Sequence, residues 1–229
     1  MQRTPEPELM DGLAQARAYA AADFSAGDQA LIDRLSVLFP SGLGSRLLDL
    51  GCGPGNISFR LADRYPDAEV IGVDGAGVML DLAQELLQQR SRQQGPALSQ
   101  RLRFLLCCLP SAELPVACTA VLSNSLLHHL HDPQVLWRSL RLCGAPGTRV
   151  YIKDLRRPAT AEAAEQLRER YLFDAPEVLQ QDYLASLHAA FRVEEVREQL
   201  QQAGLSCLQV APLDDRYLEV WGELDDGAP

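Results

Sequence analysis

The chain has 229 residues, of which 47% are hydrophobic and 23% are charged, and its formal net charge is −10. This length and composition suit one globular domain with a sizeable core. The acidic balance and the single lysine, Lys153, argue against a nucleic-acid partner, because phosphate recognition draws on clustered positive charge.

Neither a membrane span nor a secretory signal is apparent. No apolar run reaches the ~18–20 residues that a span needs, and the first residues, MQRTPEPELMDG, lack an apolar signal core. Six cysteines follow no metal-binding or disulfide-like spacing. We therefore expect a cytoplasmic protein with free thiols that does not contact a membrane.

The predicted elements begin with helical patterning over residues 6–38, in two segments. A proline- and glycine-rich break at 40–44 precedes an alternating series: strand 45–50, helix 55–65, strand 69–73, helix 76–93, strands 102–107 and 117–123, helix 132–143 and strand 147–154. Alternation of this kind predicts a parallel sheet with helices on both faces.

The last third of the chain departs from that alternation. Residues 155–190 look helical and exceed a simple connection between a strand and a helix. An amphipathic helix over 193–200 ends before Gly204, and strands follow near 205–211 and 216–221. The two late strands form a predicted hairpin, so one of them runs antiparallel to the others.

The segment from Leu47 to Gly55 reads LLDLGCGPG, an apolar run that ends in an acid and three glycines. A buried strand followed by such a loop and a helix lets backbone approach a ligand closely, at a helix N-terminus that offers free N–H groups. The spacing is G-x-G-x-G; the dinucleotide fingerprint would place a third small residue at Asn56, and no lysine of a phosphate-binding loop is present. A nucleotide-like cofactor is therefore expected.

A second landmark is the run VIGVD, which ends at Asp74, 23 residues after Gly51 (74 − 51). The tip of a second strand at this spacing places a carboxylate on ribose hydroxyls. Either landmark alone could be a tight turn or a capping Asp. Their combination favours a cofactor site.

Together, LLDLGCGPG and VIGVDGA resemble the cofactor half of the class I S-adenosylmethionine-dependent methyltransferases, in the small-molecule type-11 style. The resemblance extends from about Leu47 to Asp154. It implies a Rossmann-like α/β fold: a seven-stranded, mostly parallel sheet with one antiparallel strand. One methyltransferase domain over 1–229 would comprise an N-terminal helical lid (1–40), a cofactor-binding core (45–154), a lid insertion after the fifth strand (155–190), and a last helix with the C-terminal hairpin (191–221).

By the same resemblance, the cofactor S-adenosyl-L-methionine would be held by residues at the ends of the first four strands. Asp49 would hold the methionine end and Asp74 the ribose. Asn124 would meet the methionine amine, or else cap a helix. Backbone approach would come from Gly51, Cys52, Gly53 and Gly55, with room for adenosine at Gly75. Many relatives have an Asp for the adenine amino group where this chain has Cys108, so we expect backbone near Cys108 and Leu109 to hold adenine.

The histidines of the segment LHHLHDP raise the question of a metal. Zinc sites on helices usually combine i, i+4 spacing with ligands from elsewhere, and no acid or cysteine partner is evident in the sequence. We therefore predict no metal site. In the resembled family this stretch lies at the rim of the substrate pocket, where His128 or His129 would act as a general base or shape the pocket.

Other residues are expected on the acceptor side. Lys153 ends the fifth strand, at the edge where ligands bind in open α/β sheets. Lys153, Arg156 and Arg157 could together receive an anionic substrate. Tyr19, in the N-terminal segment, is expected to contact the cofactor or the substrate.

The resemblance implies methyl transfer to a small, possibly anionic metabolite by in-line displacement, with no covalent nucleophile required. Two alternatives remain open: a methyltransferase acting on tRNA or protein, and an S-adenosylmethionine-binding protein without methyl transfer. A nicotinamide oxidoreductase is disfavoured by Gly55-Asn56. The sequence carries no signal for an oligomeric state.

Overall fold

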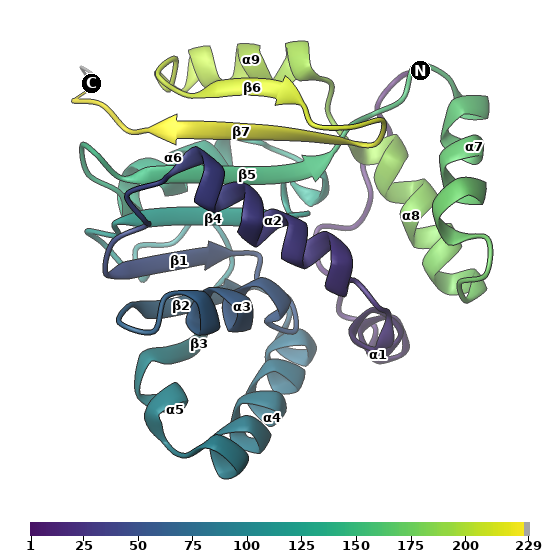
Figure 1. The fold of residues 1–229 in the computed structure, drawn as a ribbon. Helices are drawn as coiled ribbons and strands as arrows, with labels where there is room; N and C mark the ends of the chain where they lie inside the picture. The colour runs from purple at the N-terminus through teal and green to yellow at the C-terminus, as the bar shows by residue number, and fades with distance from the viewer. Residues whose placement is uncertain (227–229) are drawn as a thin grey trace.

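The computed structural model describes residues 1–226, which form one seven-stranded sheet in the order β3-β2-β1-β4-β5-β7-β6 (Figure 1). Strand β7 pairs antiparallel with both β5 and β6, and the remaining pairs are parallel. This topology confirms the predicted fold class, including the late hairpin. The strands are β1 (Arg46–Leu50), β2 (Glu69–Asp74), β3 (Leu102–Leu106), β4 (Ala120–Asn124), β5 (Arg149–Leu155), β6 (Gln209–Pro212) and β7 (Tyr217–Glu223).

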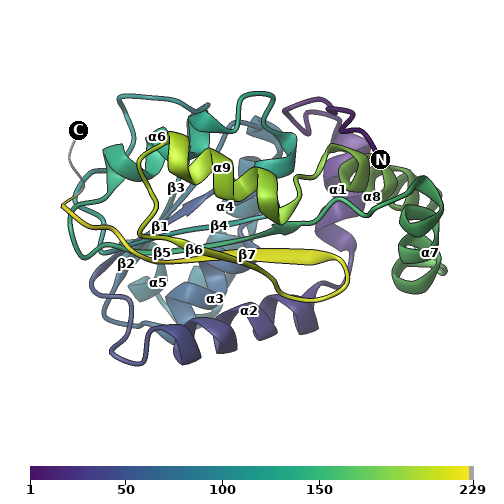
Figure 2. The ribbon, with the colours of Figure 1, turned by 90° about the horizontal axis from the view of Figure 1, so that it is seen from above.

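Helices cover both faces of the sheet, with α2 and α3 on one side and α6 and α9 on the other (Figure 2). Apolar residues of α2 (Ser25–Leu38), α3 (Asn56–Arg64), α4 (Gly77–Gln94) and α5 (Ala97–Arg101) share one core cluster. Those of α6 (Gln134–Cys143) and α9 (Val193–Gln202) share another. Because β1 is covered on both faces, Leu47, Leu48 and Leu50 are all buried, as is typical of a central parallel strand.

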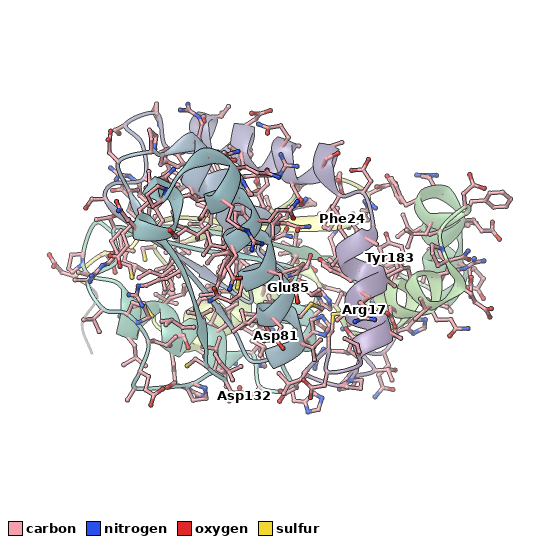
Figure 3. All side chains as sticks on the ribbon, turned by 90° about the horizontal axis from the view of Figure 1, so that it is seen from below. Arg17, Phe24, Asp81, Glu85, Asp132 and Tyr183 are labelled. Carbon is pink, nitrogen blue, oxygen red and sulfur yellow. The ribbon has the colours of Figure 1, made fainter. Side chains whose placement is uncertain are left out.

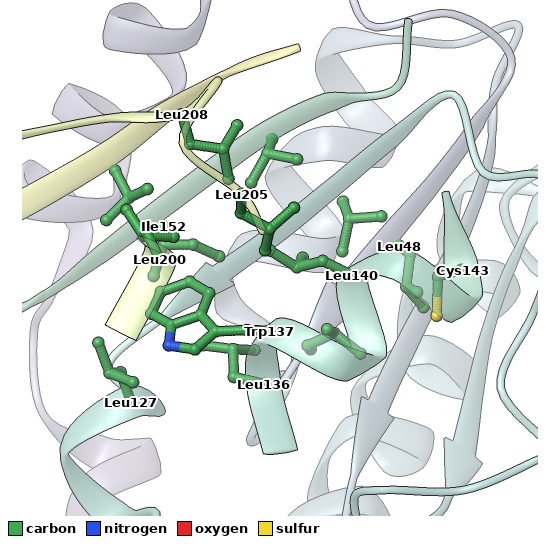
Figure 4. Close-up of a cluster of buried hydrophobic side chains, with 14 of the residues drawn as sticks. Leu48, Leu127, Leu136, Trp137, Leu140, Cys143, Ile152, Leu200, Leu205 and Leu208 are labelled. Atoms are coloured by element: carbon green, nitrogen blue, oxygen red, sulfur yellow. The ribbon is translucent and has the colours of Figure 1, made fainter. Parts of the chain in front are cut away.

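Trp137 of α6 lies at the centre of the second core cluster (Figure 4). Its side chain is fully buried, and its indole Nε1 donates to Gln199 Oε1 of α9 at 3.2 Å. A buried indole N–H needs a partner, so this bond fixes α9 against α6.

Trp137→Phe is expected to lower the free energy of unfolding by about 1–3 kcal/mol, since it leaves the buried Gln199 Oε1 without a donor. Chemical denaturation measures the change. The double variant Trp137→Phe/Gln199→Leu should recover part of the loss, because it removes the orphaned acceptor. No recovery would mean that packing alone sets the cost.

The remaining helices lie beyond the carboxyl ends of the parallel strands: α1 (Leu13–Ala21), α7 (Ala161–Leu172) and α8 (Glu177–Ala189) (Figures 1 and 2). The predicted helical insertion is thus an α7–α8 hairpin. In contrast, α2 contributes Leu31, Ile32 and Leu35 to a core cluster. Within the segment 1–40, the part over the strand ends is therefore the N-terminal portion and the first turn of α2.

The prediction that helix extends back to residue 6 is wrong. Residues 1–12, which we call the N-terminal strap, have no helix, and α1 begins at Leu13. Pro5 and Pro7 disfavour helix in this stretch because the residue before a proline is pushed toward extended backbone. Two short elements, α5 and the 3₁₀ turn Leu127–His129, were not predicted. None of the helices within residues 1–226 combines the length and apolar character of a membrane span.

Candidate active site

A cavity of about 780 Å³ opens at the carboxyl ends of β1, β2, β4 and β5. This is the edge at which open α/β sheets bind ligands. The strap, α1 and the first turn of α2 line it from one side, and the α7–α8 hairpin with the start of β7 lines it from another. All ten predicted cofactor residues except Gly55 line this cavity, as do all four predicted catalytic residues.

The glycine loop after β1 has the left-handed backbone that its sequence requires. Gly51, Gly53 and Gly55 have φ of 71°, 53° and 90°. The N–H groups of Gly51 and Cys52 both donate to Val73 O, which ties the loop to β2. Gly55 is the N-cap of α3, so it shapes the loop without lining the cavity. A Cβ at Gly51 would lie 2.9 Å from Leu126, whereas one at Gly53 would meet nothing within 4 Å.

These environments predict different outcomes for two alanine substitutions. Gly53→Ala is expected to cost about 1–2 kcal/mol of stability from its left-handed backbone and to weaken cofactor binding, because its Cβ enters the cavity. Gly51→Ala should lose more stability, since Leu126 must also move. Thermal unfolding and calorimetry measure the two effects. Gly147→Ala is the matched control, because Gly147 also has a left-handed φ of 84° and open space for a Cβ but does not line the cavity. An equal loss of cofactor affinity in Gly147→Ala would contradict the placement of Gly53 at the cofactor.

Two polar groups at the ends of neighbouring strands form the first part of the site. Asp49 is 1% exposed, and its Oδ2 accepts from Ser58 Oγ at 2.6 Å. Burial raises the pKa of Asp49 to about 7. Asn124 ends β4, and its Oδ1 is buried with no hydrogen-bond partner within the described chain. A carboxylate and a free acceptor that face one cavity fit the ammonium group of the methionine end of S-adenosylmethionine.

Asp74 ends β2 and is fixed by the loops on either side. Its Oδ2 accepts from Gly53 N at 2.7 Å, and its Oδ1 accepts from Ala76 N at 2.8 Å. Each carboxylate oxygen keeps a further lone pair, so the group can still accept from the two hydroxyls of a ribose. Burial raises its pKa. At neighbouring Gly75, a Cβ would lie 2.8 Å from Leu9 Cδ2 of the strap, so the strap packs directly over this loop.

The cysteines of the site play different structural parts. Cys52 is buried, and burial raises the pKa of its thiol, so its backbone rather than its sulfur is available to a ligand. The strand predicted over 102–107 ends one residue earlier, because β3 stops at Leu106. Both cysteines instead lie in the loop that follows, and with Leu109 they line the cavity. Cys107 also packs against the core, whereas Cys108 is exposed.

His128 is held by a carboxylate on each side. Its Nδ1 lies 2.6 Å from Asp154 Oδ1, and its Nε2 lies 3.6 Å from Glu6 Oε1. Asp154 Oδ2 also accepts from Leu127 N at 2.7 Å, which fixes the carboxylate. Burial lowers the pKa of His128, but Asp154 and Glu6 outweigh burial and raise it.

His129 stacks on His128 with ring centroids 4.2 Å apart, and its Nδ1 lies 3.2 Å from Glu6 Oε1. Burial, with the neighbouring His128 charge, lowers its pKa to about 3, so the ring is neutral. The prediction of no metal rested on the lack of an acid partner. That premise is wrong, because Glu6 reaches both histidines from more than 120 residues away in the chain.

Glu6 arrives there because the strap is anchored along its length. Thr4 N donates to His188 O at 3.0 Å, and Arg3 Nη2 donates to His128 O at 3.1 Å. Ser186 Oγ donates to Glu6 Oε1 at 3.0 Å, and His131 N donates to Glu8 Oε1 at 2.7 Å. No spacing in the sequence signals these long-range contacts, which is why Glu6 was missed.

The cationic part of the cavity differs from the prediction. Lys153 lines it, with Nζ 4.2 Å from the Tyr217 ring centroid, and burial lowers its pKa. The role predicted for Arg156 and Arg157 is wrong: neither lines the cavity. Arg156 donates to Asp214 O at 2.9 Å, and Arg157 donates to Ala190 O at 2.9 Å and pairs with Glu195.

Arg216, immediately before β7, takes the place expected of those arginines. It lines the cavity, packs over the Tyr171 and Tyr217 rings, and has a buried Nε without a partner in the described chain. Its charge also contributes to lowering the pKa of Lys153, so the two cations lie near each other. Among the described residues that line the cavity, Lys153 is the one lysine and Arg216 is the one arginine.

Aromatic residues of the covering elements complete the wall. Tyr19 of α1 lines the cavity and packs on Phe24, with ring centroids 4.8 Å apart. Burial raises the pKa of Tyr19. Phe24 and Tyr183 lie at the end of the molecule occupied by α1 and α8 (Figure 3), and both line the cavity. Phe173, by contrast, is 75% exposed and does not.

Comparison with solved structures shows how widespread this architecture is. A SAM-dependent methyltransferase from Aquifex aeolicus has a TM-score of 0.62 at 17% identity, and the match covers 91% of this chain and 97% of that one. The plantazolicin methyltransferase BpumL, in complex with a triazolic desmethylPZN analog and SAH, has a TM-score of 0.66 at 14% identity, and the match covers 93% of this chain and 90% of that one. At these identities the likeness concerns the fold.

Sequence comparison extends the match to the family. Trans-aconitate 2-methyltransferase from Methylobacterium radiotolerans is 36% identical over 100 residues, which are 44% of this chain and 34% of that relative. The chain spans about a sixth to a third of the length of the first such relatives that it matches. A family model described as a methyltransferase domain matches residues 20–210. The chain belongs to this methyltransferase-domain family and has the fold of the class I S-adenosylmethionine-dependent methyltransferases.

Proposed function

We propose that this protein transfers a methyl group from S-adenosylmethionine to a small anionic metabolite by in-line displacement. The observation that carries the donor assignment is the free, buried Asn124 Oδ1 in the same cavity as the Asp49 carboxylate. A ligand with a cationic amine satisfies both groups at once. The sulfonium is an activated leaving group, so the protein has to align the acceptor and exclude water.

On the donor side, we assign the methionine end to Asp49 and Asn124, and the ribose to Asp74. The loop Gly51, Cys52, Gly53 supplies backbone approach, and Gly75, Cys108 and Leu109 surround the adenine. Gly55 sets the loop from outside the cavity. These roles are those that the resemblance to the family implies, and the shared cavity of these residues supports them.

On the acceptor side, Lys153 and Arg216 support an anionic group. Two cations in a partly desolvated cavity favour a carboxylate or a phosphate strongly, and the guanidinium can bind either with two parallel hydrogen bonds. The name of the trans-aconitate relatives is consistent with a carboxylate acceptor. A carboxylate is already ionised at neutral pH, so its methylation requires no general base. His128, His129 and Tyr19 then form the wall that positions the acceptor.

We place this reaction in the cytoplasm and favour a small molecule over nucleic acid as the acceptor. All six cysteines are unpaired, as is usual where thiols are kept reduced. The net charge of −10 opposes a polyanion, whereas the cationic pair suits a small anion that fits a cavity of about 780 Å³.

The test is incubation of the purified protein with methyl-labelled S-adenosylmethionine and single acceptors: trans-aconitate, other di- and tricarboxylates, small phosphate esters and total tRNA. We expect label in a carboxylate or phosphate compound, in amounts that rise with time and enzyme. Label in tRNA or protein would overturn the acceptor class. Tight cofactor binding by calorimetry without transfer to acceptors from a metabolite extract would identify a binding protein instead.

A further inference from the structure

The side chains of Glu6, His128 and His129 form a compact cluster on the cavity wall. Glu6 Oε1 lies 3.6 Å from His128 Nε2 and 3.2 Å from His129 Nδ1, and the three ligand atoms lie within 4.8 Å of one another. Ligand atoms around a tetrahedral zinc ion, with bonds of about 2.0–2.2 Å, lie roughly 3.3 Å apart. The two measured distances are close to that separation.

Each histidine presents the correct nitrogen. His128 Nδ1 is held by Asp154 at 2.6 Å, so its Nε2 faces Glu6. His129 makes a hydrogen bond with the Pro7 backbone, which has only a carbonyl to offer. Because His129 Nδ1 is buried without a hydrogen-bond partner, Nε2 is the nitrogen that donates to Pro7. Metal-binding histidines are usually oriented in this manner, with the second ring nitrogen bonded to a carboxylate or a backbone carbonyl.

We propose that Glu6, His128 and His129 bind one divalent transition-metal ion, with Zn²⁺ as the best fit, at the wall of the acceptor cavity. Two imidazoles and one carboxylate leave a coordination position open, which is the donor set of metal sites that bind substrate. All three residues line the cavity, so the open position faces the space for the acceptor. Metal binding does not depend on the proposed function. The further role of the ion, which is to hold an acceptor oxygen as a Lewis acid, rests on the proposed function.

The alternative is a purely structural cluster, in which Glu6 pairs with a charged His128 and anchors the strap. Ser186, which donates to both Glu6 carboxylate oxygens at 3.0 and 3.3 Å, is consistent with either. The buried His129 Nδ1 distinguishes the metal site from the structural cluster. A Glu6–His128 ion pair leaves this nitrogen without a hydrogen-bond partner, whereas a metal ion would bind it.

The experiment uses the full chain carrying Cys107→Ser, Cys108→Ser and Cys207→Ser, because these three thiols are not buried and could themselves bind zinc. After removal of metal with a chelator, Zn²⁺ is titrated in competition with a chromophoric chelator. We expect one ion per chain, and tetrahedral visible bands when Co²⁺ replaces Zn²⁺. Glu6→Gln and His129→Ala should each weaken binding at least tenfold, and His188→Gln, outside the cluster, should not.

Calorimetry with S-adenosylhomocysteine on each variant verifies that the donor site is intact. Binding of S-adenosylhomocysteine without stoichiometric zinc binding would overturn the metal proposal and leave methyl transfer untouched. Zinc binding that survives Glu6→Gln and His129→Ala unchanged would overturn it equally. Stoichiometric zinc with no transfer to any anionic acceptor would instead contradict the proposed function, because the metal readout requires no acceptor.

Discussion

Replacing Asp49 by Asn is expected to weaken the binding of S-adenosylmethionine by about 2–5 kcal/mol, because it removes the buried charge that pairs with the cofactor amine. The carboxylate is 1% exposed, so water cannot substitute for it. Titration calorimetry measures the loss. The matched control is Asp81→Asn, on an exposed part of α4 (Figure 3), which should bind as the wild type does.

The same residue predicts a pH dependence. Burial raises the pKa of Asp49 to about 7, so below that pH the free protein carries a neutral carboxyl that attracts the ammonium group poorly. Affinity should therefore fall by up to about tenfold per pH unit from pH 7 to 5.5. In Asp49→Asn, the affinity for the cofactor should no longer fall as the pH is lowered over this range. If the affinity of that variant fell with pH as the affinity of the wild type does, a group other than Asp49 would cause the pH dependence.

Stability should respond in the opposite direction. The folded pKa of Asp49 lies above its unfolded value, so the protonated form favours folding, and this contribution is lost as pH rises from about 4 through 7. Asn has no such ionisation. Asp49→Asn should therefore lose less stability than the wild type over that pH range in the absence of ligand, which excludes unfolding as the reason for weak binding.

Lys153→Met and Arg216→Met are each expected to raise the KM for an anionic acceptor by roughly 10- to 100-fold, since each removes a charged hydrogen bond worth about 1.5–3 kcal/mol. Methionine preserves much of the apolar stem of either side chain and removes its charge. The affinity for S-adenosylhomocysteine should remain within about twofold. Steady-state kinetics with the acceptor that the labelling experiment selects, together with calorimetry, separate the two effects.

Arg138→Met is the control for these variants. Arg138 lies on α6, pairs with Asp132 at 2.9 Å and does not line the cavity, so it should not alter KM. If Arg138→Met raised KM as much as Arg216→Met did, the effect would come from overall charge. Loss of cofactor affinity in Lys153→Met would instead move Lys153 to the donor side.

The gathering of the proposed donor residues around one cavity could be predicted from the sequence because their signals are local. The strand ends at Asp49 and Asp74 and the glycines between them lie within 30 residues of chain, and the left-handed φ values at Gly51 and Gly53 are conformations that glycine adopts without strain. The right-handed crossovers of parallel sheets then fix the face of the sheet on which each connecting helix lies. These features leave little choice of arrangement.

The acceptor half could not be predicted in the same way. Arg216 and Arg156 are both arginines beside a strand end, and which of them lines the cavity depends on the path of the β6–β7 hairpin. Glu6 meets His128 only because Arg3 and Thr4 fix the strap to distant backbone carbonyls. Such contacts leave no periodicity or spacing in the sequence, so they become visible only when the chain is folded.

The reversed direction of β7 has an evolutionary consequence. An antiparallel strand starts where its parallel neighbours end, so the turn before Tyr217 delivers Arg216 to the ligand edge. Glu6 and Arg216 thus reach the cavity from near the two ends of the chain, whereas the residues proposed to hold the donor lie between positions 49 and 124. Under the proposed function, we expect substitutions in the hairpin turn to change acceptor preference while the glycine loop after β1 stays constant. We accordingly expect exchange of the turn at 213–216 between relatives to alter acceptor specificity on the same scaffold.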